Sequence, residues 1–241
     1  MGLRGLLKHI WYGRTNSAFI KYLRTKGCKV GENVRFRDRL TTLIDVSRPA
    51  LVTIGSNVDI NSYFKIYTHD WGCYVFRNKY DDFVNASGAV YIGSNIYFGT
   101  NVTILKGVSI GDNCIIGAGS VVSRSIPSNS VAVGNPCKVV SSLDEYYEKR
   151  KQRAFIEACE YVKAIQNRFH RNPYPSEMRE EFIYFVNKDN VEQYEKDGVP
   201  VKFQLAGAYD NWLLNHKSMF KNFEEFISYI NTKKNQDDTQ S

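Results

Sequence analysis

Histidine is the side chain best suited to move a proton near neutral pH, and this chain of 241 residues has four of them. His9 lies near the N-terminus, and His170 and His216 lie in the C-terminal third. Only His69 lies within a region of short sequence repeats, in the phrase Tyr67-Thr68-His69, where the repeat is interrupted. A histidine is more often structural than catalytic, so the informative observation is its position.

Cysteine and serine chemistry is not indicated. The five cysteines are odd in number and widely spaced, without a CxxC pair, so the sequence predicts neither a zinc site nor a disulfide framework. This usage is typical of a reducing cytoplasm. No serine or cysteine carries the pattern of an activated nucleophile. We therefore expect no metal and no covalent enzyme intermediate.

The element that must position His69 is a repeat of six residues. From Ile92 the sequence reads IGSNIY, FGTNVT, ILKGVS, IGDNCI, IGAGSV and VSRSIP, and an apolar residue opens every block. A period of six is neither the 3.6 of a helix nor the 2 of a strand. It predicts a coil with flat sides, in which each block makes one short strand and one turn. Each coil buries its inner face only by stacking on its neighbours.

The same phase begins near residue 30 and predicts a solenoid over residues 30–140. Its earlier first positions include Val30, Phe36, Ile54, Ile60 and Ile66. Between them Thr42 and Arg48 fall in first positions and Leu40 in a fifth, so we expect one irregular coil there. After Ile66 an aromatic and charged insertion over residues 70–88 interrupts the coils. Insertions on a rigid scaffold often carry binding groups.

The end of the repeats resembles a known family. The run IGAGSVV from Ile116, followed by Pro127 and by Val133-Gly134-Asn135-Pro136-Cys137-Lys138, closely resembles the hexapeptide-repeat acyltransferases. The nearest sub-pattern is that of the maltose/galactoside and capsular-polysaccharide O-acetyltransferases. The resemblance implies a mainly β fold, a left-handed parallel β-helix. It also implies a homotrimer that uses acetyl-CoA as co-substrate and needs no metal.

The resemblance also implies roles for single residues. His69 occupies the place of the family's catalytic histidine, a general base for the acceptor and then an acid for the leaving thiolate. The implied acetyl-CoA contacts are Gly99, Thr100, Gly117, Ala118, Ser123, Arg124 and Lys138. The glycine-rich pairs would contact the pantetheine arm and supply the oxyanion N–H. The cations would face the phosphates, although Ser141 replaces a basic residue common in the family.

Candidate acceptor contacts lie near the insertion and on the coils. Tyr97 stands where many members have tryptophan, and Trp71 opens the insertion. Asp45 and Asp70 are further candidates. A carboxylate on one ring nitrogen would also fix the tautomer of His69. Asp70 is adjacent, but adjacent side chains on an extended segment point apart, and Asp45 and Asp59 lie on preceding coils, so these alternatives stay open.

Two segments flank the coils. Residues 1–29 are expected to form a helical cap, with an apolar stripe at Leu3, Leu6, Leu7, Ile10 and Trp11. An alternative is an interfacial helix lying on a membrane. Residues 141–232 are expected to be an α-helical extension, with a helix over 143–169, a helix near 177–187, an extended piece around 199–205 and a final helix near 222–232. Residues 233–241 are expected to be disordered.

Charge and motifs narrow the function. The formal net charge is +7, with much of the excess near the N-terminus, which suits phosphorylated cofactors, acidic glycans or anionic lipid. No nucleic-acid-binding motif is present. The sequence predicts an O-acetyltransferase acting on a sugar in bacterial surface-polysaccharide assembly (capsule or O-antigen). We expect it in the cytoplasm, with peripheral association at the inner face of the cytoplasmic membrane as an open option.

Two alternatives to that function remain. One is an N-acetyltransferase of a nucleotide-linked amino sugar, because the same histidine would serve either acceptor. The other is a non-catalytic β-helix scaffold. A carbonic-anhydrase-like member would need several histidines across the coils, and only His69 lies in the coil region.

Overall fold

A computed structural model of the chain describes the backbone of residues 15–238 and the side chains of residues 15–232. The chain divides into two compact units at residues 148 and 149, a few residues after the expected boundary at 140. The apolar stripe expected over residues 3–11 lies outside the described residues. Within the described part, no helix is long and apolar enough to cross a membrane.

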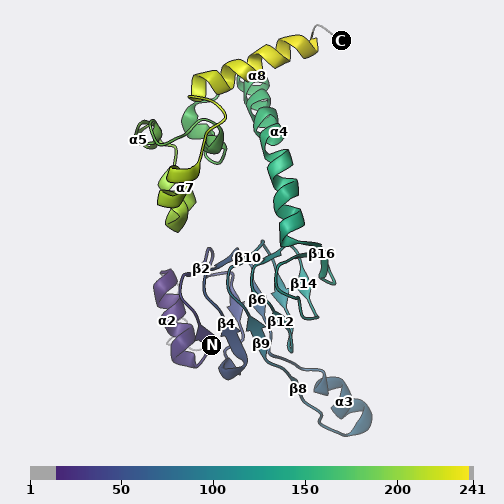
Figure 1. Ribbon diagram of the computed structural model, residues 1–241. Coiled ribbons are helices and arrows are strands. Elements are labelled where there is room, and N and C mark those ends of the chain that lie inside the picture. The colour runs from purple at the N-terminus through teal and green to yellow at the C-terminus, as the bar shows by residue number, and fades with distance from the viewer. Residues whose placement is uncertain (1–14, 239–241) are drawn as a thin grey trace. The chain divides into compact units, whose positions relative to one another are not determined.

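The first unit is built from three parallel sheets that the chain visits in turn (Figure 1). Sheet A contains β1 (Lys29–Val30), β4 (Val52–Ile54), β9 (Val90–Ile92) and β12 (Ser109–Ile110). Sheet B contains β2 (Val34–Phe36), β5 (Val58–Ile60), β10 (Ile96–Phe98), β13 (Cys114–Ile116), β15 (Ser130–Val133) and the antiparallel β16 (Lys138–Ser142). Sheet C contains β3 (Leu43–Ile44), β6 (Lys65–Ile66), β11 (Thr103–Ile104) and β14 (Val121–Val122). The prediction of stacked parallel coils is confirmed.

The register shows why the six-residue repeat folds in this way. Phe98 pairs with Ile60 on one side and Ile116 on the other, and Ile92 pairs with Ile110. The first position of each block therefore stacks on its equivalent one coil away. These side chains are fully buried. Burial of one such column per sheet supplies the core of this unit.

The turns are held by asparagines and glycines. Asn95 and Asn113 adopt a positive φ, which asparagine tolerates better than most residues. The Asn95 amide donates to the Asn113 side chain at 2.8 Å, so the turns form a ladder from coil to coil. At Gly55 a β-carbon would lie 2.4 Å from the carbonyl oxygen of Gly93. The coils can stack this closely only because glycine stands at that corner.

The irregular coil is present, but its inner residue differs from the expectation. Ile44 and not Thr42 pairs with Ile66, and Leu40 is 71% exposed instead of filling a corner. The cause is a local turn in which the Asp38 carboxylate accepts hydrogen bonds from the backbone N–H of Leu40 and the hydroxyl of Thr41. This turn lengthens the segment between β2 and β3 and shifts the phase. The residue after Ile44, Asp45, thereby takes a place that the six-residue count did not give it.

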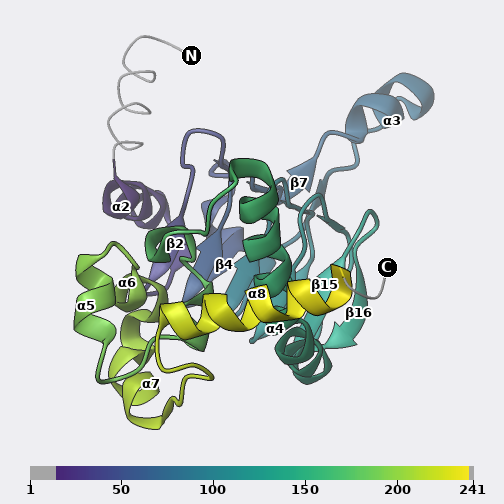
Figure 2. The same ribbon diagram turned by 90° about the horizontal axis from the view of Figure 1, so that it is seen from above.

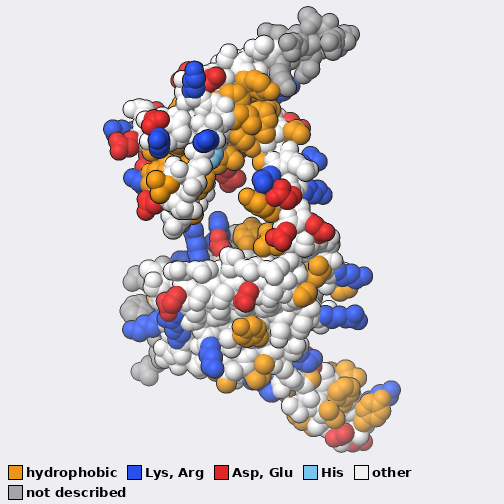
Figure 3. Space-filling view, viewed as in Figure 1, with side chains coloured by type: hydrophobic (Ala, Val, Ile, Leu, Met, Phe, Trp, Pro, Cys, Tyr) orange, Lys and Arg blue, Asp and Glu red, His pale blue; other side chains and the backbone are white. Residues whose placement is uncertain are grey.

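The insertion leaves the coils as a projecting arm (Figures 1 and 2). Strand β7 (His69–Asp70) pairs antiparallel with β8 (Ala86–Ser87), and helix α3 (Cys73–Tyr80), which the sequence did not indicate, lies between them. Figure 3 shows hydrophobic side chains gathered at the end of the arm. The chain re-enters the coils at Gly88, where a β-carbon would lie 2.7 Å from the backbone nitrogen of Gly107. The base of the arm is therefore fixed.

Helix α2 (Asn16–Lys26) covers the first coil, as expected of the cap. The Thr15 hydroxyl accepts from the N–H of Ala18, and Gly27 ends the helix at a φ of 109°. Phe19 packs edge-on against Phe36 of β2 with ring centroids 5.0 Å apart. The apolar column of sheet B is thus closed at this end.

The second unit has its own core. Helix α4 (Leu143–Phe169) has the predicted bounds, and 3-10 helices at Pro175–Glu177 and Glu181–Tyr184 replace the single helix expected near 177–187. The extended piece expected around 199–205 was wrong, because α6 (Val201–Leu205) is helical. The remaining helices of this unit are α5 (Val191–Lys196), a 3-10 helix at Ala206–Ala208, α7 (Tyr209–Asn215) and α8 (Phe223–Asp238). Helix α8 continues to Asp238, beyond the expected end of the final helix near residue 232.

The stacked columns carry a stability prediction. Replacing the fully buried Phe98 with alanine should lower the free energy of unfolding by about 3–5 kcal/mol, because the cavity opens between two coils that cannot collapse together. Replacing the exposed Leu40 with alanine should change it by less than about 0.5 kcal/mol. Urea titration of both variants checks this. Equal midpoints for the two variants would contradict the described core.

Candidate active site

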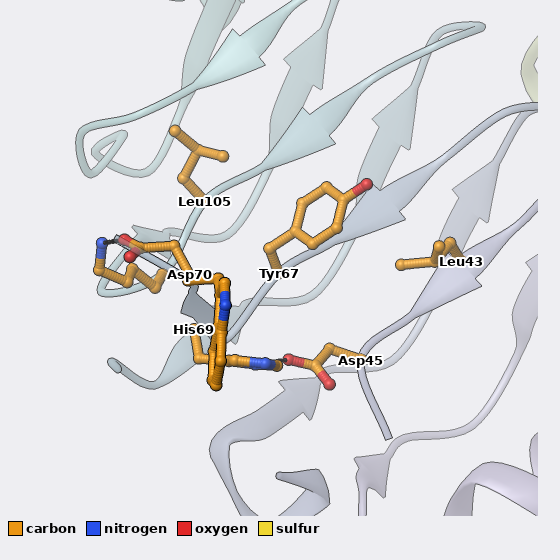
Figure 4. Close-up of a pocket in the computed structure, with 8 residues that line it drawn as sticks. Leu43, Asp45, Tyr67, His69, Asp70 and Leu105 are labelled. Carbon is orange, nitrogen blue, oxygen red and sulfur yellow. Dashed lines mark hydrogen bonds and ion pairs between the residues drawn. The ribbon is translucent and has the colours of Figure 1, made fainter. Parts of the chain in front are cut away.

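A cavity of about 540 Å³ lies where the arm leaves the coils (Figure 4). Its wall combines three segments that are far apart in the sequence: the end of β3, the chain from the end of β6 into the arm, and the residues after β11. The lining residues are Leu43, Asp45, Tyr67, His69, Asp70, Trp71, Leu105 and Lys106. The only histidine of the coil region therefore faces a cavity, together with three further charged side chains.

Asp45 is the residue that contacts His69. Its Oδ2 lies 2.7 Å from Nδ1 of His69, and Asp45 is only 9% exposed. Oδ2 also accepts from the backbone N–H of Thr68 at 3.1 Å and from the Thr68 hydroxyl at 2.5 Å. Oδ1 accepts from the N–H of Ser47 at 3.1 Å and from its hydroxyl at 2.6 Å. The carboxylate thus receives five hydrogen bonds.

These contacts fix the protonation states of the pair. Burial by itself would raise the pKa of Asp45, but the hydrogen bonds from Ser47, Thr68 and His69 outweigh it and hold the pKa well below its usual range. An ionised Asp45 can only accept, so Nδ1 of His69 must carry the proton that it donates. In the neutral imidazole, Nε2 then has a free lone pair. The hydrogen bond to Asp45 therefore leaves Nε2 as the nitrogen that can accept a proton.

The other two candidates for orienting His69 have different partners. Asp70 pairs with Lys106 through one oxygen and accepts from the N–H of Gly72 at 2.9 Å through the other. Asp59 forms a salt bridge with Arg37 at 2.6 Å. Figure 4 shows the side chains of His69 and Asp70 directed to different partners, as expected for neighbours on an extended strand. Of the three carboxylates considered, Asp45 alone contacts the imidazole.

Of the predicted acceptor contacts, Trp71 lines the cavity and Tyr97 does not. Trp71 is 60% exposed and its ring meets the ring of Phe83 edge-on. Tyr97 lies on sheet B, where its hydroxyl accepts from the Asn61 amide at 2.9 Å, and it lines a separate cavity of about 350 Å³. Within one chain, Tyr97 and His69 therefore belong to different surfaces.

The predicted acetyl-CoA contacts form a stacked group and an exposed group. The Gly99 N–H donates to the Ile116 carbonyl at 2.8 Å, and a β-carbon on Gly99 would lie 2.5 Å from the nitrogen of Ala118. Gly99-Thr100 thus lies directly against Gly117-Ala118, one coil away. The cations and hydroxyl predicted for the phosphate end, Ser123, Arg124 and Lys138, are exposed. Their roles remain predictions.

Two residues of the site were not foreseen although the sequence held a signal for them. Thr68 immediately precedes His69, and Ser47 follows Asp45 by two, a spacing at which a side-chain oxygen commonly bonds a backbone N–H. Lys106 lies 36 residues from its partner Asp70, and nothing local pointed to it. Among the described residues, no group of three or more His, Cys, Asp or Glu could hold a metal ion.

One of the two histidines of the second unit has a packing role. His216 stacks on Trp212 with ring centroids 3.8 Å apart, and burial lowers its pKa. A neutral imidazole stacked on an indole is well suited to a core. The other described histidine, His170, is exposed at the end of α4 with a φ of 52°.

Comparison with known proteins adds independent information. Residues 89–124 match the family model described as bacterial transferase hexapeptide (six repeats). Protein CapG of Staphylococcus aureus is 36% identical over 174 residues, which is 71% of this chain and 90% of CapG. The putative acetyltransferase YvoF of Bacillus subtilis (strain 168) is 30% identical over 142 residues, which is 59% of this chain and 74% of YvoF.

Among solved structures, a maltose O-acetyltransferase from Clostridium difficile 630 is similar at 30% identity. The alignment covers 56% of this chain and 82% of that chain, with a TM-score of 0.41.

Proposed function

Because the chain belongs to the hexapeptide-repeat acyltransferases, an assignment that its similarity to CapG over 90% of that protein establishes, we propose that it transfers an acetyl group from acetyl-CoA to a sugar hydroxyl. The observation that carries this proposal is the Asp45–His69 pair, at 2.7 Å, with the imidazole at the wall of a cavity of about 540 Å³. This pair supplies the base that acyl transfer to a hydroxyl needs.

The proposed reaction is a direct transfer. Nε2 of His69 takes the proton of the acceptor hydroxyl while its oxygen attacks the thioester carbonyl carbon. The carbon–sulfur bond then breaks, and the imidazolium returns the proton to the departing thiolate. Asp45 stabilises the imidazolium between these two steps and keeps the ring in one orientation. Protons and electrons balance without a further reactant.

Five features from the family resemblance belong to the same proposal. The coils wind left-handed, three copies of the chain form the enzyme, and acetyl-CoA lies between the coils of adjacent copies. Its pantetheine arm contacts Gly99-Thr100 and Gly117-Ala118, which lie against each other on adjacent coils. Its phosphates face Arg124 and Lys138. Light scattering checks the trimer, and a monomeric enzyme with full activity would contradict the intersubunit site.

The proposed acceptor is a sugar of a surface polysaccharide, modified in the cytoplasm. The test is release of free CoA from acetyl-CoA with a panel of free sugars, nucleotide sugars and surface oligosaccharides. Mass spectrometry and NMR of the product distinguish an O-acetyl from an N-acetyl group, and so decide between a hydroxyl and an amino acceptor. Absence of release with every acceptor, together with absence of acetyl-CoA binding, would favour a scaffold.

A further inference from the structure

The cavity around His69 has a charge pattern that bears on its acceptor. Its lining contains two carboxylates, Asp45 and Asp70, and one ammonium group, that of Lys106. With His69 neutral, as a base must be, these three groups have a formal sum of −1. Each of them is already engaged within the chain. An acceptor therefore enters a site whose charges have been satisfied before it binds.

The Asp70–Lys106 pair lies where it can determine the charge that an acceptor meets in the cavity. Asp70 lies in β7 at the base of the arm, and Lys106 follows β11 on the next coil. The pair therefore joins the two sides of the cavity next to His69 (Figure 4). The side chains of both residues are partly exposed, Asp70 at 49% and Lys106 at 35%, so an acceptor can reach them. The ammonium group that would attract an anionic acceptor is held by a carboxylate.

The remaining carboxylate, that of Asp45, is not available for direct contact with an acceptor. Asp45 is 9% exposed, and its two oxygens accept five hydrogen bonds from Ser47, Thr68 and His69. A carboxylate so fully engaged has little capacity for an ammonium group of an amino sugar. Its negative charge still acts through space against a second anion.

The uncharged part of the wall suits a sugar ring. Leu43, Tyr67, Trp71 and Leu105 present apolar surface, and the exposed indole of Trp71 offers a flat face. Pyranose rings have an apolar face of C–H groups and a rim of hydroxyls. The ion pair can donate to and accept from such hydroxyls without loss of its own interaction. Apolar walls with a few polar groups are the usual form of a small-molecule site.

We propose that the sugar that reacts at His69 carries no anionic group, and that the Asp70–Lys106 ion pair is the specificity determinant that excludes uronic acids and other anionic sugars. This inference rests on the proposed function, because it assigns the cavity to the acceptor. It predicts that replacing one residue of the pair changes the ratio of kcat/KM between neutral and anionic acceptors. This ratio should change more than kcat/KM for the preferred acceptor does.

The experiment compares matched sugars that differ only in charge. Methyl glucoside is paired with methyl glucuronide, and methyl galactoside with methyl galacturonide, and kcat/KM is measured for each. The wild type should prefer the neutral member by a factor of about 10 or more. Asp70→Asn removes one negative charge and frees the ammonium group of Lys106, so the preference should fall by about tenfold. Lys106→Met should raise it, and added salt should reduce both shifts.

The control is Glu32→Gln, which breaks an ion pair with Arg24 at the cap, away from the cavity. It should leave the preference unchanged. If the Asp70–Lys106 pair merely anchors the arm, Asp70→Asn will lower kcat/KM equally for both members of each sugar pair. That result, or a wild type that prefers the uronates, overturns the proposal.

Binding separates this inference from the proposed function. Saturation-transfer NMR with the same sugars on the His69→Ala variant reports occupancy of the cavity without turnover. Preferential binding of neutral sugars that Asp70→Asn reduces, without transfer by the wild type to any acceptor, would refute the acetyltransferase proposal and leave the specificity assignment standing. Binding that does not distinguish the members of a pair would refute the assignment even in an active enzyme.

Discussion

Replacing His69 with alanine should lower kcat for acceptor-dependent CoA release by a factor on the order of 10² or more, because the hydroxyl then has no base in reach. The cavity wall carries one imidazole and three charged side chains, and the alanine variant keeps the three charged side chains. KM for acetyl-CoA should change little, since the predicted contacts of that substrate lie elsewhere on the coils. Steady-state kinetics with the best acceptor of the panel measures both quantities.

A matched histidine substitution controls for general effects. His170 is exposed at the end of α4, and asparagine tolerates its positive φ. His170→Asn should keep activity within about twofold of the wild type, as expected for a surface substitution. If the two variants retain the same activity, His69 is not the base and the direct-transfer mechanism is wrong. If only His69→Ala is inactive, its circular dichroism and urea midpoint must match those of the wild type for the assignment to hold.

The parts of the fold that could be predicted are those that repetition dictates. Phe98 is buried because it stacks on Ile60 and Ile116, and every stacked column demands the same residue type every six positions. The bounds of α4 followed from its apolar stripe and the prolines after it. In contrast, α6 and the 3-10 helices lie in segments too short for periodicity to appear. Their conformation is set by packing in the second unit.

The site was predictable only in part for a related physical reason. His69 stood out because it interrupts the repeat. Its partner could not be chosen among three carboxylates, because the Asp38 turn shifts the phase of the irregular coil and brings Asp45 under Thr68. A count of six through that coil places the wrong residues inside. Lys106 was missed because it lies 36 residues from Asp70 in the sequence. Only the stacking of the coils brings the two side chains together.

Replacing Asp45 with asparagine should lower kcat by a factor of up to about 10⁴, the loss seen when the carboxylate behind the histidine of a Ser-His-Asp triad becomes an amide. An asparagine has one acceptor oxygen where Asp45 has two. Three donors meet Oδ2 and two meet Oδ1, so either placement of the amide group sets N–H against N–H. The imidazole then loses its fixed orientation or the charge that stabilises its protonated form.

A double substitution distinguishes this explanation from simple damage to the fold. If Asp45 acts through His69, adding Asp45→Asn to His69→Ala should lower kcat no further than His69→Ala does alone. Damage to the fold would lower the residual activity further. Asp59→Asn is the control, since Asp59 pairs with Arg37 outside the cavity, and its kcat should match that of the wild type. An Asp45→Asn enzyme with wild-type kcat would refute the pairing as a catalytic device.

Stability gives a second, independent readout of the same residue. The pKa of Asp45 is lower in the folded chain than in the unfolded one, so its ionised form stabilises the fold at neutral pH. That contribution is present above the unfolded pKa of about 4 and is lost as the pH falls through the folded value. The gap in unfolding free energy between wild type and Asp45→Asn should therefore be widest near neutrality and should narrow below about pH 4. A gap that is constant with pH would mean that Asp45 is not the buried, ionised acceptor on which the mechanism depends.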